Sequence, residues 1–158
     1  SEEWAREHNL PVLAYITFAE VAAVEYVKNQ QNLLLAPLFA ASRMLEKAEI
    51  SLQDFDYYEI HEAFAAQVLA TLKIWESPEL SAELGLKKTL GAIDREKLNV
   101  KGSSLAAAHP FAATGGRIIG VMAKLLNEKG EFLSGKEGEI ILDIAELTRE
   151  VIKVTTKS

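Results

Sequence analysis

Apolar positions along the chain fall into short continuous runs and longer stretches with helical spacing. Residues 11–19 form an apolar run, which predicts a strand buried on both faces. Over 37–49 the apolar residues recur every three or four positions, which predicts a helix with proline in its first turn. Residues 55–60 predict a second strand, and it leads directly into a helix with an apolar stripe over 64–75.

The middle of the chain is less regular. Residues 77–97 are polar and weakly patterned, so they predict a surface excursion with one short helical turn. A third strand with small side chains is predicted over 98–107, followed by a turn at 108–110. Residues 114–126 predict a third long helix that starts in a cluster of small residues.

The end of the chain has a different pattern. Residues 139–145 and 151–156 are rich in β-branched residues and predict an antiparallel hairpin over 139–156. The resulting order is β-α-β-α-β-α-β-β. It predicts a single α/β domain over 1–158, in three layers with a mixed sheet, because right-handed crossovers place helices over the sheet.

Composition narrows the classes of function. Of the 158 residues 49% are hydrophobic and 25% charged, as in soluble globular domains. The net charge of −6, without a basic run, argues against nucleic acid as a partner. No stretch is apolar enough to span a membrane, and no targeting segment is visible, so a cytoplasmic protein is expected. Cysteine is absent and the three histidines are scattered, so no metal site is expected.

Two histidines stand where chemistry is often found. His61 and Glu62 follow the strand predicted over 55–60, and in open α/β sheets ligands bind outside the carboxyl ends of strands. A first helical turn in which Glu62 meets the helix dipole explains them equally well. His109 precedes Pro110, and a turn histidine with only local hydrogen bonds is the alternative there.

Two glycines and three lysines are weaker candidates for binding phosphate groups. Gly115 and Gly116 suit close packing of a helix on the sheet better than a phosphate site, because no spaced glycine fingerprint surrounds them. Lys87, Lys88 and Lys97 suit phosphate groups of coenzyme A, but a solvated loop accounts for them as well.

Three stretches together resemble the C-terminal half of thiolases, the acyl-CoA C-acyltransferases. They are Tyr58-Glu-Ile-His-Glu-Ala-Phe-Ala65, Leu98-Asn-Val-Lys-Gly-Ser-Ser104 and Ala106-Ala-Ala-His-Pro-Phe-Ala-Ala-Thr-Gly-Gly-Arg117. The resemblance covers about residues 1–130. It is greatest to the thiolase subunit of the fatty-acid β-oxidation multienzyme complex, since most other thiolases carry asparagine where this chain has His61.

The resemblance implies roles for both histidines. His109 matches the family histidine that activates a cysteine contributed by the N-terminal half, and an imidazole can take the proton of a thiol near neutral pH. His61 matches the position that helps to hold the thioester carbonyl oxygen as charge develops. Glu62 is its neighbour. No cofactor is implied, because a coenzyme A thioester is the family's substrate.

Departures from the family pattern affect the chemistry. The second family cysteine, an acid/base, aligns with Ala145, and the glycine before the family histidine is Ala108. The family's glycine-rich loop is replaced by 146–150, although glycine permits backbone geometries that other residues resist. These losses indicate a degenerate or deliberately rebuilt half-thiolase.

Two hypotheses of function follow. The first is a catalytically silent structural module that keeps the fold. The second is an acyltransferase part that binds acyl-CoA or becomes active with a missing N-terminal half. The apolar stripe of the helix over 114–126 is too wide for one sheet, so a second surface is expected to cover it. The partner is then either a second copy of the chain, in a homodimer, or the missing half.

Overall fold

A mixed four-stranded sheet organises the protein. The computed structural model describes residues 1–28, 33–132, 139–144 and 150–155. Its elements in chain order are α1 (Glu2–Glu7), β1 (Tyr15–Val21), η1 (Leu33–Leu35), α2 (Ala36–Ala48), η2 (Leu52–Asp54), β2 (Tyr57–Ile60), α3 (Ala65–Glu76), α4 (Pro78–Glu83), η3 (Arg95–Lys97), α5 (Ser104–Ala107), α6 (Thr114–Phe132), β3 (Glu139–Ile144) and β4 (Glu150–Thr155). The strand order is β1-β4-β3-β2. Among the described strands β2 and β3 pair in parallel and the other two pairs are antiparallel, so the predicted mixed sheet is confirmed.

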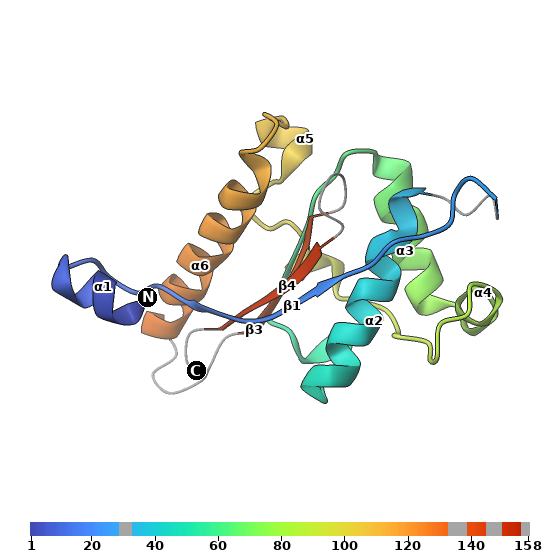
Figure 1. Ribbon diagram of the computed structural model, residues 1–158, viewed down its shortest axis with the longest axis horizontal. Coiled ribbons are helices and arrows are strands. Elements are labelled where there is room, and N and C mark those ends of the chain that lie inside the picture. Colours follow the sequence, from blue (N-terminus) through green and yellow to red (C-terminus); the bar gives the residue numbers. More distant parts are fainter. Residues whose placement is uncertain (29–32, 133–138, 145–149, 156–158) are drawn as a thin grey trace.

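Helices cover both faces of this sheet. Figure 1 shows α6 on one side of the strands and α2 and α3 on the other. α2 contacts β1 and β4, whereas α6 contacts β2, β3 and β4. The fold therefore has three layers, as the alternation of strands and helices predicts.

The larger core lies under α2 and α3. Its largest fully buried side chains include Phe55 and Trp75, with Leu38, Met44, Leu45 and Leu72 around them. Burial of each such side chain stabilises the fold by roughly 1.5–3 kcal/mol. α2 has Pro37 in its first turn, where the missing N–H costs nothing, and ends at Glu49 in a left-handed conformation.

The second core forms where α6 meets the other face. Ile118, Met122 and Leu126 recur every four residues and are completely buried. Ile119 and Val121, at the edges of the stripe, are only partly buried and pack against this cluster. The centre of the wide apolar stripe therefore faces the sheet, and its edges are half-exposed.

The first predicted strand is wrong in position and in burial. β1 begins at Tyr15 and lies at the edge of the sheet, paired only with β4 among the described strands. Ile16 and Val21 are exposed, at 58% and 54%. An apolar run is typical of a central strand, but at an edge one side of the strand stays open, and the run alone does not distinguish the two.

The strand predicted over 98–107 is also wrong. Leu98 makes a single parallel bridge with Tyr58, and then the chain turns. Asn99 and Gly102 have φ angles of 51° and 71°, outside the extended region of a regular strand. The segment then enters the short helix α5, so small residues here serve a tight turn.

Candidate functional site

His61 lies directly after the carboxyl end of β2. The strand ends at Ile60 and α3 begins at Ala65, so His61 and Glu62 occupy the junction expected from the sequence. The His61 side chain is almost completely buried. The neighbours of a buried imidazole hold it in one orientation, so the contacts of His61 determine which way each ring nitrogen points.

His109 comes from a distant part of the chain and meets His61. It lies in the connection between α5 and α6, and the two ring centroids are 4.2 Å apart, with 42° between the ring planes. Phe111 touches the outer side of His109, with ring centroids 5.1 Å apart in an edge contact. The structure thus brings together the two histidines that the sequence analysis singled out.

A hydroxyl group holds each ring. His61 Nδ1 lies 2.5 Å from Ser104 Oγ, in the first turn of α5. His109 Nδ1 lies 2.6 Å from Thr114 Oγ1, at the start of α6. Both contacts are short hydrogen bonds, so each ring is oriented through its Nδ1 atom.

Glu62 ties the loops of the site together. One carboxylate oxygen accepts a hydrogen bond from Asn99 Nδ2 at 2.9 Å, and the other accepts one from the Leu105 backbone N–H at 3.1 Å. The Asn99 side chain also pairs with both the N–H and the carbonyl of Ile60, at 2.8 and 3.1 Å. The junction and the turn before α5 are therefore one hydrogen-bonded unit.

A buried ion pair supports Ser104. Arg117 Nη2 donates a hydrogen bond to Ser104 Oγ at 3.0 Å, and Arg117 Nη1 lies 3.8 Å from Glu59 Oε1. The Glu59 side chain is completely buried. Burial raises the pKa of the Glu59 carboxyl, and the Ser103 hydroxyl and the Arg117 guanidinium oppose that rise.

Sequence reasoning missed Glu59, Ser104 and Arg117. A glutamate inside a short apolar strand was the available signal for Glu59, because a buried carboxylate needs a partner. Arg117 lies among small and apolar residues in the sequence, and its positive charge could have been paired with Glu59. Their contact depends on the turn after Leu98, which the sequence pattern did not predict.

Exposed apolar side chains lie close to the histidines in the sequence. Leu105 and Phe111 are 71% and 77% exposed, and Phe64, at the start of α3, is 58% exposed. Each is close in sequence to a residue that contacts or forms the histidine pair. Large apolar side chains exposed around buried polar groups are typical of a surface that another polypeptide covers.

Other candidates do not join this site. Lys87 pairs with Glu46 at 2.7 Å, and Lys97 donates to the Phe55 carbonyl at 3.0 Å, so neither extends towards the histidines. A side chain added at Gly116 would meet nothing within 4 Å. Close helix-to-sheet packing is therefore the wrong explanation of that glycine.

Ala145, which we expect from the sequence to align with a family cysteine, lies outside the described residues. Within the described ranges no group of three histidine or acidic side chains is placed to hold a metal ion. The same ranges contain no helix long and apolar enough to cross a membrane.

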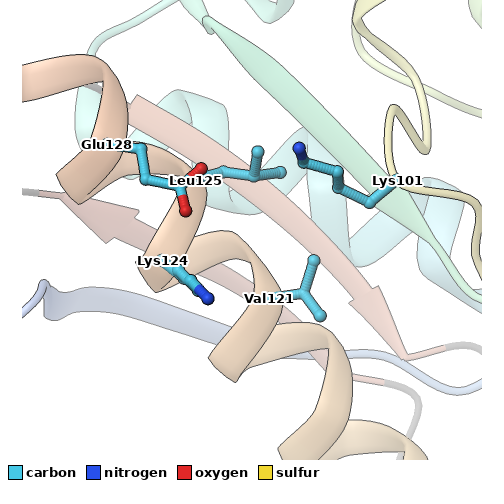
Figure 2. Close-up of a pocket in the computed structure, with 5 residues that line it drawn as sticks. All are labelled: Lys101, Val121, Lys124, Leu125 and Glu128. Carbon is cyan, nitrogen blue, oxygen red and sulfur yellow. The ribbon is translucent and has the colours of Figure 1, made fainter. Parts of the chain in front are cut away.

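A shallow cavity of about 220 Å³ lies on α6, well along the helix from Thr114. Figure 2 shows its lining: Lys101 from the turn after Leu98, and Val121, Lys124, Leu125 and Glu128 from the helix. None of these residues contacts the histidine pair in the hydrogen bonds and ring contacts described above. The lining of the cavity combines two apolar side chains with three charged ones.

Comparison with known proteins gives a consistent picture. Residues 10–135 match the family model described as the C-terminal domain of thiolase. The 3-ketoacyl-CoA thiolase of Colwellia psychrerythraea is 42% identical over 127 residues, which are 80% of this chain and 28% of the relative. The corresponding protein of Aliivibrio fischeri is 40% identical over 131 residues, 82% of this chain and 29% of the relative.

Solved structures agree with the sequence relatives. Human mitochondrial 3-ketoacyl-CoA thiolase in complex with CoA superposes with a TM-score of 0.66 and 28% identity, over 100% of this chain and 34% of that one. Bacillus anthracis acetyl-CoA acetyltransferase gives a TM-score of 0.62 and 32% identity, over 99% and 34%. The chain is thus an α/β domain with the thiolase fold. It belongs to the thiolase family, whose C-terminal domain it carries, and it spans less than a third of the length of these two sequence relatives.

Proposed function

We propose that this chain supplies the histidine half of a thiolase-type acyl-transfer site and is silent until another polypeptide segment brings a thiol. The contact between the His61 and His109 rings, 4.2 Å apart, carries the proposal. Two imidazoles from distant segments, each oriented by a hydroxyl, form an arrangement that can move a proton and donate a hydrogen bond beside one substrate atom.

The two rings have different roles in this proposal. His109 takes the proton of an incoming thiol and makes the thiolate that attacks an acyl thioester. His61 donates a hydrogen bond to the thioester oxygen as negative charge develops on it. The proposed substrate is a 3-ketoacyl thioester of coenzyme A, as the names of the relatives suggest, which connects the chain with fatty-acid β-oxidation.

The thiol has to come from elsewhere, because the 158 residues contain no cysteine. Phe111 contacts His109, and Phe64 and Leu105 are near the site residues in sequence; all three are exposed, which favours a covering segment there. The proposed partner is therefore a segment equivalent to the N-terminal part of the longer relatives. A second copy of the chain, packed through the helix over 114–126, is the alternative partner. Location in the cytoplasm remains an expectation from the sequence.

A structural module without chemistry is the second candidate function. One observation favours it: Ala108, next to His109, has φ 64° and ψ −175°, a conformation that suits glycine. The thiolase resemblance implies glycine at this position, so alanine places a strained backbone next to the histidine that would have to act. The two candidates differ in whether the histidine pair still works.

The test is thiolysis of acetoacetyl-CoA by the purified chain, alone and co-expressed with the N-terminal part of the Colwellia psychrerythraea relative. The chain alone should give no turnover. The complex should give turnover that His109→Ala abolishes and that His8→Ala, at the exposed end of α1, leaves unchanged. A stable complex without turnover would favour the structural module, and turnover by the chain alone would contradict both candidates.

A further inference from the structure

Ser104 Oγ lies between two side chains that matter to the site. His61 Nδ1 is 2.5 Å away on one side, and Arg117 Nη2 is 3.0 Å away on the other. Ser104 is only 7% exposed, so water has little access to its hydroxyl. The direction of these two hydrogen bonds determines which nitrogen of His61 carries the proton.

The direction follows from the available donors. A guanidinium has only N–H donors, so Arg117 donates to Ser104 Oγ. The serine hydroxyl then needs an acceptor for its own hydrogen. Among the described residues Ser104 Oγ makes no hydrogen bond other than these two, which leaves His61 Nδ1 as the acceptor.

The opposite direction costs free energy. If His61 Nδ1–H donated to Ser104 Oγ, the buried hydroxyl hydrogen would have no partner, and a buried donor without a partner is unfavourable. Donation from a cation also polarises the hydroxyl and makes it a stronger donor. We infer that Ser104 and Arg117 hold His61 as the neutral tautomer with its proton on Nε2, so that this ring is a fixed hydrogen-bond donor.

Arginine suits the role of orienting the Ser104 hydroxyl because its planar guanidinium presents nitrogens in two directions. Nη2 donates a hydrogen bond to Ser104 Oγ, and Nη1 lies 3.8 Å from Glu59 Oε1, beyond hydrogen-bond distance. The buried carboxylate of β2 therefore attracts the guanidinium that orients the serine by charge. Lysine presents a single nitrogen and cannot keep both contacts at the same geometry. Glu59, Arg117 and Ser104 thus form a relay of positioning residues behind His61.

The same geometry separates the roles of the two histidines. His109 also has a hydroxyl partner, Thr114, but among the described residues no arginine or lysine donates to Thr114 Oγ1. In the part of the chain that the structure describes, an arginine stands behind the hydroxyl partner of His61 and not behind that of His109. The role as donor to a thioester oxygen rests on the proposed function, whereas the tautomer does not.

The decisive experiment is a long-range ¹H–¹⁵N correlation spectrum of the full chain with ¹⁵N-labelled histidine at neutral pH. His8→Gln and His109→Gln assign the three rings. The expected pattern for His61 is a protonated Nε2 and an unprotonated Nδ1. Protonation at Nδ1, on both nitrogens, or a fast mixture of tautomers in the parent protein would overturn the inference, whatever the variants do.

Variants then test the relay. Ser104→Ala and Arg117→Lys should turn the single His61 tautomer into a mixture, whereas Ser104→Thr, which keeps the hydroxyl, should retain it. A Ser104→Ala spectrum unchanged from the parent would refute the role of Ser104.

In the complex described above, Ser104→Ala should lower kcat about tenfold at a similar KM, less than the roughly 10²–10³-fold typical of deleting an oxyanion donor. An inactive parent complex with the expected His61 spectrum would refute the proposed function and leave the tautomer established.

Discussion

Ala108 holds a backbone conformation that glycine adopts without strain, and Ala108→Gly measures that strain directly. Its φ of 64° and ψ of −175° place Ala108 in a region open almost only to glycine. Such a conformation costs about 1–3 kcal/mol in a residue with a side chain. Glycine also makes the unfolded chain more flexible, which reduces the gain in the free energy of unfolding by about 0.4–1 kcal/mol.

The strain that is relieved exceeds the effect on the unfolded chain, so Ala108→Gly should raise the free energy of unfolding by about 1–2 kcal/mol. For a domain of this size that gain corresponds to a rise of roughly 2–8 °C in Tm. The assay is urea unfolding at neutral pH, followed by circular dichroism, with thermal unfolding in parallel.

Ala107→Gly is the matched control, because Ala107 ends α5 and its φ is not among the positive values. There the same change should lower stability by about 0.5–1 kcal/mol. If Ala108→Gly were as destabilising as Ala107→Gly, the strain at Ala108 would not exist in solution, and the observation that favours a structural module would disappear.

The remaining predictions concern charge, association and the missing thiol. Because burial raises the Glu59 pKa above its ordinary value of 4.5, the folded state binds more protons than the unfolded state above that pH, and Glu59 costs stability there. Urea unfolding should therefore show the stability of Glu59→Gln relative to the parent increasing as the pH rises from 4 towards neutrality, and a difference that is constant or falls with pH would contradict this. If the chain forms a homodimer through the helix over 114–126, Val121→Glu at its half-buried edge should shift light scattering towards the monomer mass of 17.4 kDa, and a parent that is monomeric at all concentrations would refute the dimer. Met122→Glu is unsuitable for that test, because Met122 is fully buried and the change would unfold the second core. Ala145→Cys should leave the Tm within about 1–2 °C of the parent, since cysteine behaves as a small apolar residue, and should give no turnover with acetoacetyl-CoA alone.

The sequence predicts those parts of the fold that have a strong local signal. The helix from Pro37 and the helix from Thr114 start at or within one residue of their observed positions, because proline and a four-residue apolar repeat mark them. The strand before His61 and the helix after it place the histidine correctly, since a change of hydrophobic period marks the junction.

Non-local contacts account for the errors. The apolar run over 11–19 resembles a central strand, but its burial depends on where β1 joins the sheet, which no local pattern encodes. The segment after Leu98 turns because Asn99 pairs its side chain with Ile60 and adopts φ 51°. That turn brings Ser104 to His61. Because the turn depends on a non-local contact, the sequence predicts neither the turn nor the relay of Glu59, Arg117 and Ser104.

Asn99 also bears on how the isolated chain behaves at high concentration. By pairing with the N–H and the carbonyl of Ile60, its amide occupies hydrogen-bonding groups that an outer strand would otherwise offer to a neighbouring molecule. At the opposite edge, Arg43 Nη1 donates to the Val21 carbonyl at 3.3 Å, but the Ile16 and Val21 side chains of β1 are exposed. Aggregation by strand addition should therefore begin at β1, and a lysine at Ile16 would protect the chain more than any change next to Asn99.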